Sequence, residues 1–303
     1  MSGRSPHSEA EVRTGVLLGL GAYTLWGVFP VYFKLVAEVA PLEVLTHRIV
    51  WAVPFGALII LARSQWREVV RAFSDPRTVA WLALAAVSIA ANWLIYIWAV
   101  QNDRILESSL GYYINPLMYV VAGIWIFSES LSRLQLIAVL SAAIGVAVLT
   151  ISLGEFPWVA VSLAALFTAY GVIRKQAPVG AMPGLFVETV LLFLPALVFM
   201  LWLGTQRRLE FGNETSMTLM LLSAGPITVV PLVLFAFAAK RLELVTIGFM
   251  QFLGPTLQFL IGLWYGERLT TAHIICFGFV WAAVVVFSID ALQKQRRRLA
   301  EPL

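Results

Sequence analysis

The chain alternates between long apolar stretches and short polar connections along almost its whole length. An α-helix needs about 20 residues to cross the roughly 30 Å of hydrocarbon in a bilayer. Ten stretches of that kind can be placed, at residues 15–36, 42–62, 78–100, 108–127, 134–153, 157–173, 182–203, 217–239, 244–265 and 272–292. Strands are disfavoured, because lipid does not tolerate an open sheet edge and these stretches lack the alternation of a barrel strand. The pattern predicts an all-α polytopic membrane protein of ten transmembrane helices.

Two of the stretches resemble each other. Residues 109–131 read SLGYYINPLMYVVAGIWIFSESL and residues 247–269 read IGFMQFLGPTLQFLIGLWYGERL. Each has a Gly near its start, a Pro in its middle and Glu-x-Leu at its end. Because ten spans form two copies of five, and five is odd, the second copy must enter the membrane in the opposite orientation. We therefore expect two inverted five-helix repeats with a substrate site between them near the membrane midplane. The expected divisions are a tail at 1–14, repeats at 15–153 and 154–292, and a basic tail at 293–303.

Composition supports a lipid environment. The chain is 60% hydrophobic and 13% charged, with a mean hydropathy of +0.86. A water-facing globule of this length could not bury so much apolar surface, so the lipid bilayer is an expected partner. The single cysteine, Cys276, lies in an apolar stretch, which argues against a disulfide framework and a Cys-based metal site. We expect no metal and no cofactor.

The basic residues are unevenly distributed, and their placement argues against nucleic-acid binding despite a net charge of +4. They lie in the short connections. With the N-terminus cytoplasmic, fifteen lie in inside segments, five lie in outside loops, and Arg48 lies within a span. Cytoplasmic connections of membrane proteins are enriched in Lys and Arg. The distribution predicts a multi-pass plasma-membrane protein with both termini cytoplasmic.

Several short segments carry a family resemblance. They are YTLWGVFPVYFK (23–34), LTHRIVW (45–51), NWLIYIWAV (92–100), SLGYYINPL (109–117), AYGVIRK (169–175) and the two Glu-x-Leu ends. Together they resemble the RarD branch of the EamA family, within the drug/metabolite transporter superfamily. The likeness extends from Gly15 to Asp290 and implies ten helices in two five-helix repeats. It also implies a carrier of small metabolites, often an exporter, in a bacterial inner membrane.

His47 and Arg48 are the first candidate site residues. A charge at the centre of a span is unfavourable by about 2.5–3.5 kcal/mol on insertion scales, so these side chains need a role. Arg48 offers a bidentate fork to a substrate carboxylate, and His47 offers a titratable group for proton coupling. The alternative is a structural ion pair with Glu43, four residues before His47 on the same helix face.

Asn92 and Tyr96 are candidate substrate contacts in the third span. Their i, i+4 spacing places them on one helix face, whereas Trp93 and Trp98 are expected to point elsewhere. Trp98, at the end of the span, is expected to be an interfacial anchor. The alternative role of Asn92 is an interhelical hydrogen bond, which contributes about 1 kcal/mol.

Polar residues also follow one face of the fourth and ninth spans. Tyr112 and Asn115 are spaced i, i+3, and Gln251, Pro255 and Gln258 are spaced i, i+4, i+7. An amide that faces lipid lacks a hydrogen-bond partner, so we expect both faces to line the substrate cavity. Tight helix packing is the alternative.

Three prolines are predicted hinges, namely Pro116, Pro231 and Pro255. Each removes a helical hydrogen bond and permits a kink. Breaks at matching positions of two repeats are the best sequence indicator of a transporter site.

Aromatic and acidic residues complete the candidate set. Trp26, Tyr32 and Tyr170 are proposed as aromatic walls of the cavity, with ordinary core packing as the alternative. Glu188 is proposed as a coupling residue, with an ion pair to Arg174 or Lys175 as the alternative.

Two further features are expected to be purely structural. One is the pair Glu129 and Glu267 in the Glu-x-Leu ends, and the other is a capping box at Ser132-x-x-Gln135.

The predicted function is secondary transport of a small organic metabolite or drug-like solute, as an exporter or exchanger working by alternating access. No G-x-x-x-x-G-K-[ST] loop is present, which argues against ATP drive. The alternative is a membrane-embedded enzyme acting on a lipid-like substrate. It is disfavoured because the three His lie in separate segments and no H-E-x-x-H or G-x-S-x-G string occurs. A channel is a third possibility, and monomer and homodimer both stay open.

Overall fold

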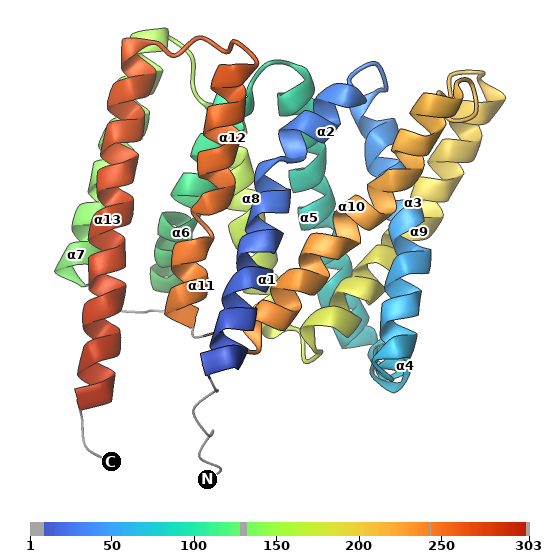
Figure 1. The fold of residues 1–303 in the computed structure, drawn as a ribbon, viewed down its shortest axis with the longest axis horizontal. Helices are drawn as coiled ribbons and strands as arrows, with labels where there is room; N and C mark the ends of the chain where they lie inside the picture. Colours follow the sequence, from blue (N-terminus) through green and yellow to red (C-terminus); the bar gives the residue numbers. More distant parts are fainter. Residues whose placement is uncertain (1–8, 128–131, 243, 301–303) are drawn as a thin grey trace.

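The computed structural model describes residues 9–127, 132–242 and 244–300, and this part of the chain contains helices and no strands (Figure 1). In chain order the helices are α1 (Glu9–Gly27), α2 (Phe29–Leu35), α3 (Pro41–Ala62), α4 (Trp66–Ser74), α5 (Pro76–Gln101), α6 (Ile105–Phe127), α7 (Arg133–Leu153), α8 (Trp158–Gln176), α9 (Ala181–Thr205), α10 (Thr215–Ala239), α11 (Leu244–Met250), α12 (Leu253–Trp264) and α13 (Thr271–Ala300). Ten segments of the described chain are long and apolar enough to cross a membrane, and each overlaps one predicted span. The prediction of a ten-span all-α protein is confirmed.

Local sequence signals explain several helix ends. Asp75 accepts hydrogen bonds from the backbone N–H of Arg77 and Thr78 at 3.2 and 3.1 Å, so it caps α5. The predicted capping box is confirmed, since Ser132 and Gln135 exchange side-chain and backbone hydrogen bonds at the start of α7. The helix α7 then ends at a Gly with a φ of +70°, a backbone conformation that favours glycine.

The two halves of the chain run in opposite directions. The start of α1 and the end of α13 lie on one side of the bundle, here called the terminal side (Figure 1). The helix α8 begins on the opposite, far side, where Val159 lies against Glu107 at the start of α6.

Helix packing repeats with the halves exchanged. The pair α1 and α10 corresponds to α8 and α5, and the pair α1 and α12 corresponds to α8 and α6. In the same way α3 packs on α10 and α9 packs on α5, while α7 packs on α13. This exchange of partners is the packing expected of an inverted repeat. The exact boundary between the repeats stays a prediction.

Two spans are broken into shorter helices. The first is interrupted at Val28, between α1 and α2 and two residues before Pro30. The ninth is interrupted at residues 251–252, between α11 and α12 and just before Pro255. The predicted hinge Pro255 therefore adjoins a break, whereas the break near Pro30 is an addition to the predicted set.

The other two predicted hinges lie inside continuous helices. Pro116 falls within α6 and Pro231 within α10, which also contains Pro226. Neither helix is interrupted there, so a hinge role for Pro116 and Pro231 stays a prediction.

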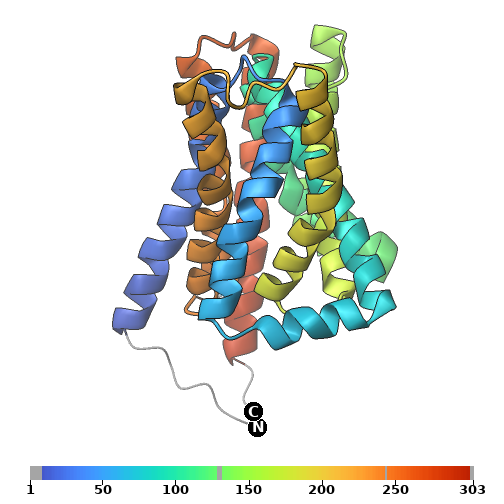
Figure 2. The same cartoon turned by 90° about the vertical axis from the view of Figure 1, so that its right-hand side faces the viewer.

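The short helix α4 connects the second and third spans and was not expected from the sequence. It lies across the terminal side of the bundle (Figure 2). Val69 and Ala72 are buried, while Trp66, Val70 and Phe73 are exposed at i, i+4, i+7. An amphipathic helix of this kind is typical of the membrane interface.

Large apolar side chains cover the outside of the bundle. Trp125 is 84% exposed and Ile151 is 81% exposed. Such a surface is compatible with lipid as the surrounding solvent and not with water.

Candidate functional site

Arg48 lies buried in α3 among residues from three other helices. Its Nε donates a hydrogen bond to Oγ1 of Thr228 in α10 at 3.1 Å. Its guanidinium carbon lies over the rings of Trp93, Phe33 and Phe29, at 4.5, 5.3 and 5.8 Å from their centroids. Trp93 belongs to α5 and the two Phe residues belong to α2. Both halves of the chain thus contribute to one site.

Three tyrosines complete the surroundings of Arg48. Tyr32, Tyr96 and Tyr112 lie close enough to interact electrostatically with its charge. The Tyr96 ring packs edge-on against Phe33 and Tyr112, with centroid distances of 5.8 and 5.6 Å. We refer to these eight residues as the Arg48 cluster. Its members are Arg48, Phe29, Tyr32, Phe33, Trp93, Tyr96, Tyr112 and Thr228.

Asn92 borders this cluster. Its Oδ1 accepts a hydrogen bond from the Tyr112 hydroxyl at 3.4 Å, and its Nδ2 donates to the Leu163 carbonyl of α8 at 2.9 Å. Asn92 therefore makes the interhelical hydrogen bond that was its alternative role, and it also orients a cluster tyrosine. The structure thus brings together five of the predicted residues, namely Arg48, Tyr32, Asn92, Tyr96 and Tyr112.

Among the described residues, two polar groups of the cluster find no hydrogen-bond partner. They are Nη1 of Arg48 and the hydroxyl of Tyr96, and both atoms are buried. Within the part of the chain that the structure describes, no carboxylate forms an ion pair with Arg48. A buried charge is strongly unfavourable unless it is paired. The guanidinium of Arg48 is therefore expected to need an anionic partner that the described residues do not supply.

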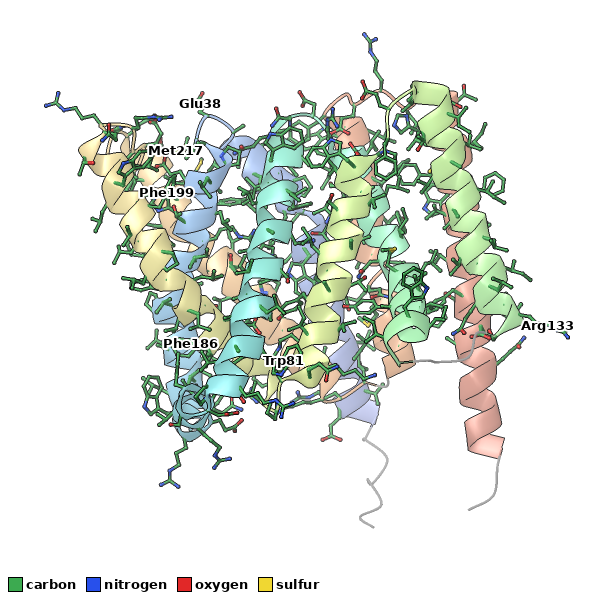
Figure 3. The ribbon with its side chains drawn as sticks, turned by 180° about the vertical axis from the view of Figure 1, so that it is seen from behind. Glu38, Trp81, Arg133, Phe186, Phe199 and Met217 are labelled. Atoms are coloured by element: carbon green, nitrogen blue, oxygen red, sulfur yellow. The ribbon has the colours of Figure 1, made fainter. Side chains whose placement is uncertain are left out.

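A narrow apolar cleft leads to the cluster. The space in it that a water molecule can occupy is about 30 Å³, and all the space between its walls, the open mouth included, is about 430 Å³. One end lies at Trp93 and Thr228, and the other at Phe186 of α9, near the terminal side (Figure 3). The remaining lining residues come from α3, α9 and α10; they are Ala52, Gly56, Ile59, Ile60, Met182, Leu185, Thr189, Val229 and Leu232.

His47 lies outside the cluster, although it precedes Arg48 in the chain. Its Nδ1 accepts a hydrogen bond from Nε1 of Trp51 at 3.1 Å, and its ring stacks on Phe211 with centroids 5.0 Å apart. Its Nε2 lies 3.7 Å from Oε1 of Glu43. Successive helical residues differ by about 100° in direction, so the two side chains meet different neighbours. This approach is close enough for the alternative role, a pairing of His47 with Glu43, although Nε2 forms no hydrogen bond there. A coupling role for His47 stays a prediction.

Glu188 and Tyr170 form a second polar group between α8 and α9. Oε1 of Glu188 lies 3.2 Å from Nε of Arg174, and its Oε2 accepts a hydrogen bond from the Tyr170 hydroxyl at 3.2 Å. Glu188 is thus the ion-pair partner of Arg174, as its alternative role required. Tyr170 belongs to this group and not to the Arg48 cluster, because its hydroxyl binds Glu188. The short connection between α8 and α9 brings the two helices together here.

The remaining predicted residues contact other helices. Oδ1 of Asn115 accepts a hydrogen bond from Oγ1 of Thr168 at 3.1 Å, which joins α6 to α8. Gln251 lies at the break between α11 and α12. Trp26 packs against Tyr23 and Phe235, with centroid distances of 5.4 and 5.7 Å. These contacts are those of helix packing, the alternative given above.

Gln258 completes the backbone hydrogen bonding of a broken helix in the other half. In a regular helix the Trp26 carbonyl would accept from the N–H of residue 30, which is a proline without that group. Nε2 of Gln258 donates to this carbonyl at 3.2 Å instead. Gln258 is 4% exposed, and its Oε1 has no partner.

Sequence reasoning missed four cluster residues: Thr228 of α10 and the three aromatic residues Trp93, Phe29 and Phe33. The expectation that Trp93 points elsewhere is wrong, because its large indole reaches across to Arg48 on α3. A signal for the two Phe residues was available, since they are spaced i, i+4 on one face of the short helix α2.

Glu267 has the structural role expected of it. Its carboxylate accepts hydrogen bonds from the backbone N–H groups of Ile105 and Leu106, at 2.5 and 2.8 Å, and so caps α6. Glu129, its counterpart in the first repeat, lies outside the described residues. Within the described ranges, no three His, Cys, Asp or Glu residues are grouped so that they could hold a metal ion.

Comparison with known proteins identifies related chains. A model of the EamA-like transporter family matches residues 13–151. An uncharacterized transporter of Vibrio cholerae is 41% identical over 94% of this chain and 95% of its own length. Protein RarD of Escherichia coli is 40% identical over 95% of this chain and 98% of its own. The uncharacterized transporter YojE of Bacillus subtilis is 38% identical over 95% and 98%.

One solved crystal structure supports the fold alone. It is 19% identical in sequence and superposes with a TM-score of 0.58, covering 91% of this chain and 96% of the other.

Proposed function

Because this chain belongs to the EamA-like transporter family, we propose that it is a secondary carrier that moves a small organic solute by alternating access. The observation that carries the proposal is the buried guanidinium of Arg48, which has no carboxylate partner among the described residues. Two of its contacts, Trp93 and Thr228, line the cleft. An arginine with a purely structural role inside a membrane is expected to have a counter-ion within the protein. In a binding site, the bound solute can supply the counter-ion instead. Substrate contact is assigned to Arg48, Tyr32, Tyr96, Tyr112 and Asn92.

The position of the site is suited to alternating access. Arg48 is seven residues from the start of α3, so it lies about 10 Å below the far side. The site is shared by helices of both halves, as a rocking mechanism requires. A relative movement of the halves would therefore change access to Arg48 from either side.

The contacts of this structure fit a state that is open toward the terminal side. The cleft runs from that side to Trp93 and Thr228, which contact Arg48. On the far side, Lys34 pairs with Asp103 at 2.5 Å, and Oε1 of Glu107 accepts a hydrogen bond from the Val159 backbone at 2.9 Å. We take the terminal side as cytoplasmic, because it carries most Lys and Arg residues. The state is then inward-facing, and it would receive solute from the cytoplasm for export or exchange.

Two buried groups are candidates for proton coupling, and they lie toward opposite sides of the membrane. His47 is near the far side with Glu43, and Glu188 is near the terminal side with Arg174 and Tyr170. In a proton-driven carrier, one of them must exchange a proton with water in each cycle. Replacing the coupling residue, as in Glu188→Gln or His47→Gln, would abolish accumulation driven by a pH gradient and leave solute exchange intact.

The central test is transport by purified protein in liposomes. Uptake of a panel of radiolabelled organic acids, amino acids and nucleobases would be measured with and without a pH gradient. Accumulation against a gradient identifies a carrier and excludes a channel. Arg48→Ala is expected to abolish the uptake, while Arg67→Ala on the exposed face of α4 leaves it unchanged. Unaltered uptake by Arg48→Ala would remove Arg48 from the site.

A further inference from the structure

We infer that the solute bound at Arg48 is an organic monoanion with an apolar or aromatic body, and not a cation or a zwitterion. The inference rests on the proposed function, because it names the chemistry of the same site. Its starting point is the pair of groups without partners, Nη1 of Arg48 and the hydroxyl of Tyr96. Both can donate a hydrogen bond, and a carboxylate has two oxygens that can accept.

The charge of the site requires a negative ligand. A neutral ligand would leave the guanidinium unpaired after it displaced water from the cleft. A carboxylate neutralises the charge and matches the fork of N–H groups of an arginine. Trp93, Phe29 and Phe33 lie against the guanidinium. Nη1 is the nitrogen of this guanidinium that keeps an unused N–H for the anion.

Within the described residues, both buried glutamates already pair with basic groups of the protein, although Oε1 of Glu188 has no hydrogen bond. Glu43 is engaged by the Glu210 backbone N–H and by His47. Glu188 is engaged by Arg174 and Tyr170. The acceptor of Gln258 that lacks a partner carries no charge and belongs to an amide held on α1. An amino acid would therefore keep its ammonium group desolvated and unpaired.

The remaining surroundings select the body of the solute. Aromatic rings surround Arg48, and the cleft that leads to it is lined almost entirely by apolar side chains. Aromatic and aliphatic walls bind an apolar body, while a few polar groups fix its orientation. A carboxylic acid with a single ring or a short apolar chain meets both requirements.

The inference can be tested with four ligands that share one phenyl group and chain length. They are 3-phenylpropanoate, 3-phenylpropanamide, 3-phenylpropylammonium and phenylalanine. Their affinities would be measured by calorimetry and by thermal shift on the purified protein in nanodiscs. The anion is expected to bind at least about tenfold more tightly than the amide, as a charge-assisted hydrogen bond predicts. The ammonium ion and phenylalanine are expected to bind more weakly still.

Variants identify the groups responsible. Arg48→Gln should reduce the affinity for the anion to that for the amide, whereas Arg48→Lys should keep part of the preference. Tyr96→Phe removes the second donor. It should lower the affinity for the anion several-fold and leave the affinity for the amide unchanged. This variant therefore tests the inference even if Arg48→Gln does not fold. Arg67→Gln is the matched control and should bind like the wild type.

The inference is overturned by equal binding of anion and amide, by tighter binding of the amine or of phenylalanine, by anion binding that survives in Arg48→Gln, or by no binding of any of the four. Transport in liposomes separates these failures from failure of the proposed function. If uptake of another class of solute depends on Arg48, the proposed carrier function is supported and the inference of an anionic solute is refuted. Binding of 3-phenylpropanoate at Arg48 with no accumulation would sustain the anion site and refute the carrier.

Discussion

The guanidinium of Arg48 lies over the indole of Trp93, with Cζ 4.5 Å from the ring centroid. An aromatic face attracts a cation by about 0.5–2 kcal/mol, which is much less than a buried carboxylate supplies. The charge is therefore only partly compensated in the absence of ligand. The proposed anion site rests on this relationship, which also leads to the first prediction.

Replacing Arg48 should stabilise the protein while abolishing its function. In Arg48→Met no counter-ion is left unpaired, and Thr228 keeps its hydrogen bond to the Ala224 carbonyl at 2.8 Å. Exchange of a poorly paired buried charge for an apolar side chain should raise stability by roughly 1 kcal/mol or more. The measurement is the melting temperature in detergent, together with uptake into liposomes.

The matched control is Arg174→Met. This substitution leaves the buried Glu188 without its partner, so stability should fall by roughly 2–3 kcal/mol. If both variants melted earlier than the wild type by the same amount, Arg48 would be structural.

Gln258→Leu should destabilise the protein through the Trp26 carbonyl. Gln258 is the donor that the described residues offer to that carbonyl, because residue 30 is a proline without an N–H. Leaving a buried acceptor unsatisfied costs about 1–3 kcal/mol. Pro30→Ala restores a backbone N–H at the position that a helix needs. In a double-mutant cycle, Gln258→Leu should therefore cost much less in the Pro30→Ala background. Additive melting-temperature changes would rule out this account of the contact.

Gly225→Ala should disrupt the packing of α3 on α10. A Cβ at this position would lie 2.5 Å from the Trp51 carbonyl oxygen and 2.7 Å from its carbon, both of which are backbone atoms. The helices must separate, at a cost of about 1–3 kcal/mol, as in other overpacked interiors. Gly278→Ala, where nothing lies within 4 Å of the added Cβ, should be neutral or stabilising. Thermal unfolding of the two variants would decide the point, and equal behaviour would contradict the predicted contact.

Glu267 should make stability depend on pH. Burial raises the pKa of its carboxyl above the ordinary 4.5, although hydrogen bonds from Leu106 and Ile105 oppose this shift. The folded protein therefore takes up a proton at a higher pH than the unfolded chain does. As pH falls from 7 toward 4.5, the wild type should gain stability relative to Glu267→Gln. Melting curves across this range test the slope, with Glu155→Gln at an exposed position as the control. A difference that does not change with pH would refute the prediction.

The spans could be predicted because their lengths and apolar content are direct requirements of the bilayer. The helix α4 could not be read in the same way, since it has only nine residues and lies at the membrane interface. Its exposed stripe of Trp66, Val70 and Phe73 was nevertheless visible as an i, i+4, i+7 pattern.

The site was harder to predict because one sequence gives directions around each helix but not the identity of its neighbours. His47 and Arg48 are adjacent in the chain, yet they face Phe211 and Trp93 respectively. The size of a side chain matters as well, because the Trp93 indole reaches a neighbour that its place on the helix did not suggest. By contrast, the pairing of Glu188 with Arg174 follows from two antiparallel helices joined by a short connection.

The hydrogen bond from Gln258 to the Trp26 carbonyl joins the two discontinuous spans, which come from opposite halves of the chain. A bend at either break that moved these two groups apart would leave the Trp26 carbonyl without the Gln258 donor. The amide thus links the two breaks, and in the proposed alternating-access cycle this contact would make both of them move together.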